Sequence, residues 1–168
     1  MRITLQDIKN NPIFTTYIKR ADEYLTQVGY TEHSFVHVGK VANEAARILR
    51  QTGHDERTAE LAAIAGYLHD IGNIVNRKGH EQSGALMVFT LLAQMGADPD
   101  DIATIVTAIG NHDEGSAMPV SDISAALILA DKSDVRRSRV RNQETIAFDI
   151  HDRVNYAVVD TRMSVLAE

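Results

Sequence analysis

Apolar side chains recur three or four residues apart through most of the chain, almost to residue 141. This spacing places them on one face of successive helices, and only three prolines interrupt the pattern. The period predicts an all-α bundle of about six to seven helices, because an apolar helix face must be covered by another element. A chain of 168 residues can enclose one core, so we expect a single helical domain over residues 1–141.

Capping residues predict where these helices begin and end. Pro12 and Gly29 bound a first helix, since proline costs nothing in a first turn and glycine commonly follows the last. The N-caps of the later helices are predicted at Ser34, Asp55, Asp98 and either Ser121 or Asp122. The four helices that these residues cap cover about residues 35–51, 56–70, 99–110 and 123–137, a fifth covers about 81–94, and a loop covers 72–79.

The pattern changes after Arg141. Three short β-branched stretches, Thr145–Ile150, Val158–Val159 and Met163–Leu166, fit either strands or a marginal helix. Residues 142–168 are therefore expected to form a C-terminal arm, either as a small β hairpin or as a segment that pairs with another subunit through an exposed edge. The second arrangement would make the protein a homodimer.

Net charge indicates which partners the protein disfavours, and the length of its apolar runs indicates its cellular location. The net charge is -6, which disfavours binding to nucleic acid or to an anionic membrane, although five of the basic residues lie between Asp131 and Arg141. Arg2 precedes any apolar run, and the longest clean run, Ala125 to Ala130, has six residues. Neither a secretory signal nor a membrane span is expected, so we predict a cytoplasmic protein.

The chain has seven histidines and no cysteine. The absence of cysteine excludes disulfides, thiolate zinc sites, iron–sulfur clusters and a cysteine nucleophile. Any metal must therefore be held by histidine, aspartate, glutamate or water.

The doublet His69-Asp70 stands at the end of an apolar helix, shortly before Gly72. A structural explanation exists, because histidine favours a helix C-terminus and aspartate can start a turn. Asp131 indicates that these residues could instead belong to a cation site. Its spacing from Leu127 and Ile128 puts a carboxylate on a buried helix face. Such a carboxylate requires a cation, which is either a metal or one of the nearby arginines.

Three further histidines stand near predicted helix ends: His37, His80 and His112. Each alone fits a surface or hydrogen-bonded histidine. Together with the doublet in Leu68-His69-Asp70-Ile71-Gly72-Asn73 and the motif Leu129-Ala130-Asp131-Lys132, their order resembles the HD-domain superfamily of metal-dependent phosphohydrolases. The resemblance covers about residues 33–141 and implies an all-α fold named after the His-Asp doublet.

The resemblance implies a role for each of these positions. His37, His69 and Asp131 would hold one divalent metal, and Asp70 would bridge to a second that His80 and His112 complete. Imidazoles and carboxylates suit Fe or Mn foremost, and also Zn, Co, Ni or Mg. Two such metals can activate water, so the implied reaction is cleavage of a phosphoester or phosphoanhydride by metal-bound hydroxide.

Candidate substrate-binding and catalytic residues surround these ligands. Lys132, Arg136 and Arg77 are candidates for binding substrate phosphates, although such charges usually form a solvated face. Asp70 and Lys132 are the candidate catalytic residues, with Lys132 or a metal-bound water protonating the leaving group. We expect Arg137, Arg139 and Arg141 to face solvent.

The substrate is expected to be a nucleotide or another small phosphorylated metabolite. The branch of the superfamily that cleaves cyclic di-GMP carries a His-His pair and a Gly-Tyr-Pro, whereas Asn111-His112 and Gly115–Pro119 stand here, which argues against that substrate and a third metal. Two alternatives remain open: a module that senses nucleotides without catalysis, and a dinuclear-iron oxygenase of the same fold. The histidines left without a metal role are His33, His54 and His151.

Overall fold

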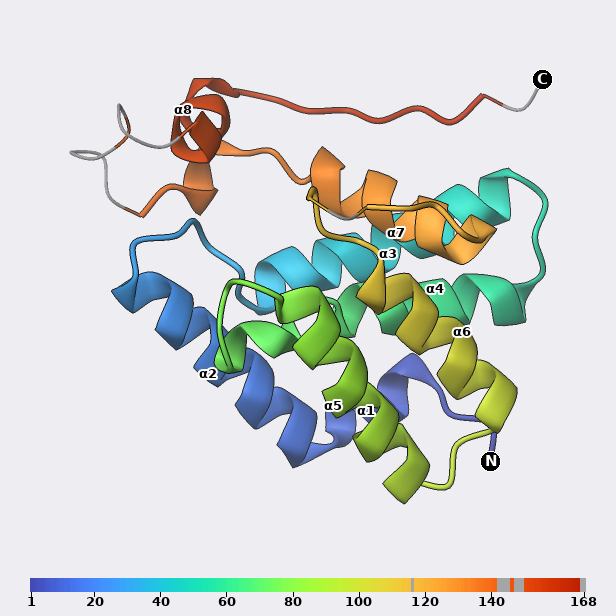
Figure 1. The fold of residues 1–168 in the computed structure, drawn as a ribbon. Helices are drawn as coiled ribbons and strands as arrows, with labels where there is room; N and C mark the ends of the chain where they lie inside the picture. Colours follow the sequence, from blue (N-terminus) through green and yellow to red (C-terminus); the bar gives the residue numbers. More distant parts are fainter. Residues whose placement is uncertain (116, 142–145, 147–149, 167–168) are drawn as a thin grey trace.

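The computed structural model describes residues 1–115, 117–141, 146 and 150–166 (Figure 1). Within these ranges the chain forms eight α-helices and two short 3₁₀ helices, and none of these residues belongs to a strand. The predicted all-α bundle is confirmed. The elements are α1 Leu5–Asn10, α2 Pro12–Gln27, α3 Phe35–Gln51, α4 Glu56–Leu68, η1 Ile71–Ile74, α5 His80–Gln94, α6 Pro99–Gly110, α7 Asp122–Ser133, η2 Arg137–Arg139 and α8 Ile150–Ala157.

The predicted N-caps are present in the structure. The side chains of Ser34, Asp55, Asp98 and Ser121 each accept a hydrogen bond from a main-chain N–H in the first turn of α3, α4, α6 and α7. These bonds satisfy donors that have no partner inside a helix. The sequence signals for these four helix starts are therefore confirmed.

Two helix boundaries differ from the prediction. Helix α7 ends at Ser133 and not near Arg137, because Asp134 leaves the helical conformation with φ -78° and ψ 65°. The predicted loop over 72–79 begins with the 3₁₀ helix η1, which directly follows the His69-Asp70 doublet. Both changes place turns of the chain beside the predicted metal ligands.

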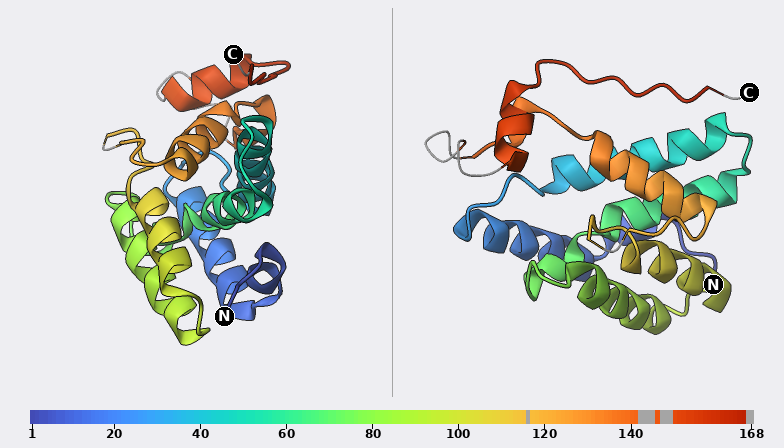
Figure 2. Two further views of the ribbon diagram at one scale, coloured as in Figure 1. Left: turned by 90° about the vertical axis from the view of Figure 1, so that its right-hand side faces the viewer. Right: turned by 45° about the horizontal axis from the view of Figure 1, so that its top comes forward.

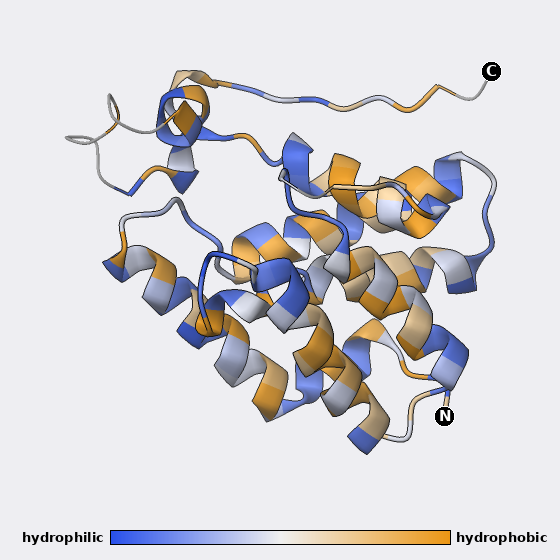
Figure 3. Cartoon of the chain, in the orientation of Figure 1, coloured by the Kyte–Doolittle hydropathy of each residue, from blue (hydrophilic) through white to orange (hydrophobic). Residues whose placement is uncertain are grey.

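Helices α3, α4 and α7 pack against one another and bring distant ligands together. Gly66 of α4 lies so close to Ala42 of α3 that a Cβ would stand 3.0 Å from the Ala42 backbone. Helix α5 packs on α6 and on η1, and η1 also contacts α2. Figure 3 shows hydrophobic and hydrophilic stretches on the bundle helices, and a hydrophilic loop between η1 and α5. The packing thus holds η1 between α2 and α5, and α6 joins α5 to α4 and α7.

The C-terminal arm differs from the expected hairpin. Ile150–Ala157 is the helix α8, and residues 158–166 have no regular secondary structure. The strand interpretation is therefore wrong for Val158–Val159 and for Met163–Leu166, whereas residues 145 and 147–149 lie outside the described part. Two hydrogen bonds attach this region to the bundle, because Arg47 donates to the main-chain oxygen of Met163 and the Thr161 hydroxyl donates to that of Val135.

Helix α8 is attached to η2. Asn155 Oδ1 accepts a hydrogen bond of 3.0 Å from the Arg136 main chain, and Arg137 Nε donates to the main-chain oxygen of Tyr156 at 2.7 Å. Both views in Figure 2 place α8 and the segment after it outside the main bundle, on the side of α7. The homodimer stays a prediction. None of the helices in the described ranges is long and apolar enough to cross a membrane.

Candidate metal centre

The six predicted ligands converge at one place in the bundle. His37 belongs to the first turn of α3, and the His69-Asp70 doublet directly follows α4. The other three are His80, the first residue of α5, His112, just after α6, and Asp131, in the last turn of α7. The five that precede Asp131 are buried, and Asp131 is partly buried. Five helices thus contribute to one cluster of imidazoles and carboxylates.

One half of the cluster gathers around the doublet. Nε2 of His37 lies 3.3 Å from Asp131 Oδ1, and Nε2 of His69 lies 3.6 Å from the same oxygen. Asp70 approaches from the other side, with Oδ2 3.5 Å from His37 Nε2 and 3.0 Å from His69 Nε2. The donor atoms of His37, His69 and Asp131 lie within 4.8 Å of one another, a spacing at which they could hold one cation.

The other half uses the second oxygen of Asp70. Its Oδ1 lies 3.3 Å from His80 Nε2, which in turn lies 3.2 Å from His112 Nε2. Asp70 thus presents one oxygen to each half, as a bridging carboxylate does. Asn73 fixes this orientation, because its side-chain amide donates to Asp70 Oδ1 at 2.8 Å and to the Asp70 main-chain oxygen at 2.9 Å.

Each imidazole is anchored through its other nitrogen. His69, His80 and His112 donate from Nδ1 to the main-chain oxygens of Gly66, Arg77 and Ile109 over 2.6–3.0 Å. His37 donates from Nδ1 to Asp134 Oδ2 at 2.8 Å. An oxygen acceptor requires the proton on Nδ1, so each neutral ring turns the Nε2 lone pair toward the centre.

These residues fit a divalent cation. The Nε2 atoms of His37 and His69 are buried, and neither has a hydrogen-bond partner among the described residues. Buried polar atoms of this kind are costly unless something pairs with them. The 3.2 Å between His80 Nε2 and His112 Nε2 matches two nitrogens bound about 2.1 Å from one metal, which are about 3.0–3.4 Å apart. The cluster could therefore bind metal.

The charges of the cluster depend on one another. Burial lowers the pKa of His37 and His69, but the surrounding carboxylates outweigh it and raise these pKa values to about 9 and about 10. Burial and the neighbouring His69 lower the pKa of His112 to about 4. Burial would raise the pKa of Asp70 and Asp131, yet the histidines hold both well below the usual value. Without a metal, two imidazolium groups therefore neutralise two carboxylates.

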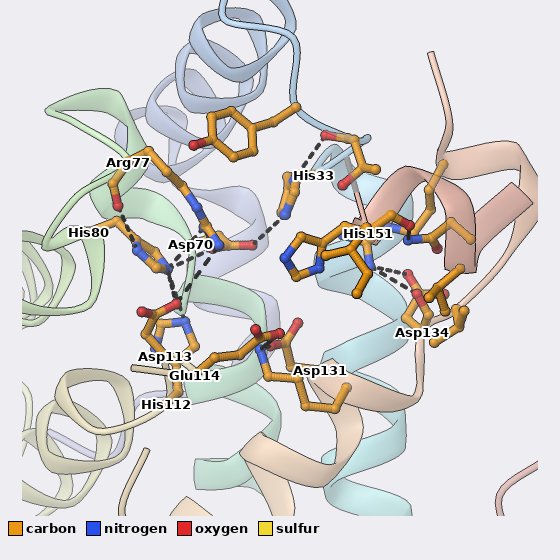
Figure 4. A pocket seen from close by; sticks show the side chains of 18 residues that line it. His33, Asp70, Arg77, His80, His112, Asp113, Glu114, Asp131, Asp134 and His151 are labelled. Carbon is orange, nitrogen blue, oxygen red and sulfur yellow. Dashed lines mark hydrogen bonds and ion pairs between the residues drawn. The ribbon is translucent and has the colours of Figure 1, made fainter. Parts of the chain in front are cut away.

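A cavity of about 470 Å³ opens above the cluster, and Figure 4 shows the side chains that line it. Asp70, His80, His112 and Asp131 contribute to its lining, and α8 supplies Ile150, His151, Val154 and Asn155. Two of the three predicted phosphate ligands, Arg77 and Lys132, also line it. The cavity thus joins the predicted ligands to positive charge and to an apolar wall.

The other basic residues are placed differently from expectation. Arg136 is not among the residues that line the cavity, and its guanidinium pairs with Asp134 and Glu32. Arg139 was expected to face solvent, but it is buried, because it donates to the main-chain oxygens of Glu32 and Asp134. Arg137 is exposed, and Arg141 is partly buried and pairs with Asp22. Most of the basic stretch therefore binds carboxylates of the protein itself.

No role in the site was predicted for four residues near the cluster. Asn73 orients Asp70, Asp134 bonds to His37, and Asp113 and Glu114 pair with the cavity cations. Asp113 and Glu114 directly follow His112, so their position next to a predicted ligand was an available signal. Asp134 stands three residues after the predicted ligand Asp131, but its partner His37 is 97 residues away in the sequence.

The family model for the HD domain matches residues 32–155. The chain belongs to the HD-domain family. The match includes all six predicted ligands and extends through most of α8. It therefore confirms the family to which the sequence motifs pointed.

Two relatives share moderate identity with this chain. Ribonuclease Y of Campylobacter hominis is 29% identical over 144 residues, which are 86% of this chain and 26% of that protein. Uncharacterized protein MJ1020 of Methanocaldococcus jannaschii is 25% identical over 156 residues, 80% of this chain and 60% of that one. The chain thus spans about a quarter of the first relative and three fifths of the second.

A solved structure shares the fold. The crystal structure of a predicted HD superfamily hydrolase from an uncultured Thermotogales bacterium superposes with a TM-score of 0.59 and 26% sequence identity. The superposition covers 79% of this chain and 68% of the other. This similarity confirms the HD-type helical bundle.

Proposed function

We propose that this HD-domain protein is a metal-dependent phosphohydrolase that cleaves a phosphoester or phosphoanhydride of a nucleotide or another small phosphorylated metabolite. The observation that carries the proposal is the convergence of four imidazole Nε2 atoms and two carboxylates under a cavity that also presents Arg77 and Lys132. Membership of the HD-domain family and similarity to a predicted HD superfamily hydrolase support hydrolysis in general.

The proposed ligand sets follow the two halves of the cluster. His37, His69 and Asp131 would hold one divalent cation, His80 and His112 would hold the second, and Asp70 would contact both. Fe or Mn suits this mixture of nitrogen and oxygen donors. When bound, such cations supply Lewis acidity toward a phosphoryl oxygen and make water a stronger nucleophile.

Charge at the centre would favour a phosphate despite the net charge of -6. The two ligand carboxylates offset half the charge of two divalent cations and leave the centre about +2. At the rim, Lys132 Nζ lies 3.3 Å from Glu114 Oε1 and 2.9 Å from Asp131 Oδ2, and Arg77 lies 3.8 Å from Asp113. A bound phosphate would exchange these carboxylate contacts for contacts with its own oxygens.

Lys132 is better suited to hold a phosphate than to protonate a leaving group. Burial lowers its pKa, but Asp131 and Glu114 outweigh burial and raise it above the ordinary value. A lysine with a raised pKa keeps its proton during the reaction and acts through its charge. Protonation of the leaving group is then assigned to water in the cavity.

The cavity volume of about 470 Å³ is in the range of small-molecule sites.

Hydrolysis of a substrate panel tests the proposal. Purified protein loaded with Mn(II), or anaerobically with Fe(II), is incubated with nucleoside mono-, di- and triphosphates, a generic phosphodiester and a short RNA oligonucleotide. We expect metal-dependent turnover of at least one nucleotide, and its loss in Asp70→Asn. Metal-loaded protein that binds nucleotides and hydrolyses none would instead support the sensing module. Oxygen consumption with a mixed-valent iron signal would support the oxygenase.

A further inference from the structure

Asp134 contacts a proposed metal ligand without belonging to the ligand set. Its Oδ2 accepts a hydrogen bond of 2.8 Å from His37 Nδ1, and both side chains are buried. We infer that Asp134 is a positioning residue, which holds the His37 ring with Nε2 toward the centre and thereby sets how tightly the cation beside His37 is bound. This inference rests on the metal centre proposed above.

The anchor of His37 differs from the anchors of the other three imidazoles. His69, His80 and His112 donate to neutral main-chain oxygens, and the nearest carboxylate to His80 Nδ1, that of Glu81, is 3.4 Å away. A carboxylate acceptor forms a stronger bond than a carbonyl and makes the opposite ring nitrogen a better electron-pair donor. His37 is therefore the imidazole whose donor strength depends most on its anchor.

Asp134 is itself held in place by two arginines. Arg136 Nε donates to Asp134 Oδ1 at 2.9 Å, and Arg139 Nη1 donates to the Asp134 main-chain oxygen at 2.9 Å. Arg136 Nη2 also donates to Asp134 Oδ2, at 3.3 Å, so the guanidinium contacts both oxygens while Oδ2 faces His37 Nδ1. The arginines also provide the positive charge that a buried carboxylate needs.

The same arginines tie Asp134 to the chain just before His37. Arg136 pairs with the Glu32 carboxylate, Arg139 Nε donates to the Glu32 main-chain oxygen at 3.0 Å, and the Glu32 main-chain N–H donates to the Arg139 oxygen at 2.8 Å. The entry into α3 is thus linked to the segment after α7. Since α3 carries His37 and α7 carries Asp131, this link also fixes the separation of two proposed ligands of one cation.

The experiment compares cation binding by the wild type, Asp134→Ala and Asp134→Asn. Mn(II) affinity and stoichiometry are measured by competition with a chelator and by the electron paramagnetic resonance signal of free Mn(II). We expect Asp134→Ala to bind one of the two cations about 10–100-fold more weakly, the range found when such anchoring groups are lost. Asp134→Asn should lose less, because its amide oxygen can still accept the Nδ1 proton.

A second readout separates positioning from general stability. In ¹⁵N-histidine spectra the His37 Nδ1–H should keep its hydrogen-bonded shift in Asp134→Asn and lose it in Asp134→Ala. Asp22→Asn is the matched control, because it removes a carboxylate that pairs with Arg141 of the same basic stretch and contacts none of the proposed ligands. It should leave both affinities at the wild-type value.

The outcomes distinguish this inference from the proposed function. Wild-type protein that binds no cation would contradict the proposed function. Wild-type protein that binds cations, with folded Asp134→Ala binding them equally well, would overturn the positioning role alone. If Asp134→Ala does not fold, Asp134→Asn decides: unchanged affinity for both cations overturns the inference, and a loss confined to one cation supports it.

Discussion

Arg77 directs its guanidinium at His80, with Nη1 3.2 Å from the imidazole Nε2 and 3.7 Å from Asp70 Oδ1. These are the two atoms proposed to face the second cation. The ring of Tyr30 supports the guanidinium from one side, 5.6 Å from its carbon. A guanidinium and a metal ion in the same place would repel each other, so the proposed second cation would compete with Arg77 for His80 and Asp70.

Arg77→Gln is expected to strengthen binding of the second cation and to weaken binding of a phosphorylated substrate. The first effect follows from removal of the competing charge, and the second from loss of a phosphate contact. We expect a several-fold change in each, measured as Mn(II) affinity and as KM. Lys78→Ala removes a neighbouring exposed cation and is the control. Weaker binding of the second cation by Arg77→Gln would contradict the competition.

Lys132→Ala is expected to raise KM about 10-fold or more, because hydrogen bonds to charged groups contribute about 1.5–3 kcal/mol. The metal ligands are unchanged, so the number of bound cations should stay the same. Steady-state kinetics with elemental analysis of the variant measures both quantities. Lys19→Ala serves as the comparison, because Lys19 is an exposed cation outside the cavity and should leave KM nearly unchanged. An equal KM increase in Lys19→Ala and in Lys132→Ala would reject this assignment.

The metal-free protein should lose stability as the pH rises. The pKa values of His37 and His69 are raised to about 9 and about 10, above the 6.5 of a free imidazole. Between the pKa of a free imidazole, 6.5, and these raised pKa values, the folded state therefore binds more protons than the unfolded state. Their stabilising contribution is fully present below about pH 6.5 and is lost as the pH rises through 9 to 10. Urea unfolding of chelator-treated protein at several pH values measures the trend.

Cation binding should have the opposite pH dependence. The metal must displace protons from His37 and His69, so the apparent affinity should rise with pH and binding should release protons. Calorimetric titration in two buffers of different ionisation enthalpy counts the protons released. Binding heats that are equal in the two buffers would mean that neither imidazole is protonated in the metal-free protein.

Gly72→Ala tests the close contact between η1 and α5. A Cβ at Gly72 would stand 2.0 Å from the main-chain oxygen of His80 and 2.5 Å from the nitrogen of Gly84, so the start of α5 must move. We expect the free energy of unfolding to fall by about 3 kcal/mol, and cation affinity to fall because His80 is displaced. Gly39→Ala has open space within α3 and should stabilise the protein by about 0.5–1 kcal/mol. Chemical denaturation of both variants measures the difference.

The order and type of most helices could be predicted because their signals are local. Ser34 and Asp98 cap helices through bonds to residues two positions away, and such bonds can be inferred from the sequence. Helix α1 was missed because six residues are too short to show a period, although the Thr4-Asp7 capping box was a usable signal. Helix α8 was missed because most of it lies between two of the β-branched stretches, Thr145–Ile150 and Val158–Val159.

The candidate ligands could be selected by motif, whereas their supporting contacts could not. His37 and Asp134 meet only because α3 and α7 pack side by side, and the motifs and caps in the sequence do not tell which helices pack together. Arg139 was expected in solvent because a basic stretch usually is solvated. It is buried because Glu32 and Asp134 both need its donors, a requirement that exists only in the folded chain. The contacts that support the candidate ligands join residues far apart in the sequence, and they could be identified only from the structure.

The cavity above the cluster is built from two separate regions of the chain. Its floor carries ligands from α4 to α7, whereas one wall comes from α8, which supplies Ile150 and Val154. A substitution in that wall changes the shape of the cavity and leaves every proposed metal ligand in place. We expect proteins that share this ligand set to diverge at these wall positions, so that evolution can exchange the substrate while the reaction is retained.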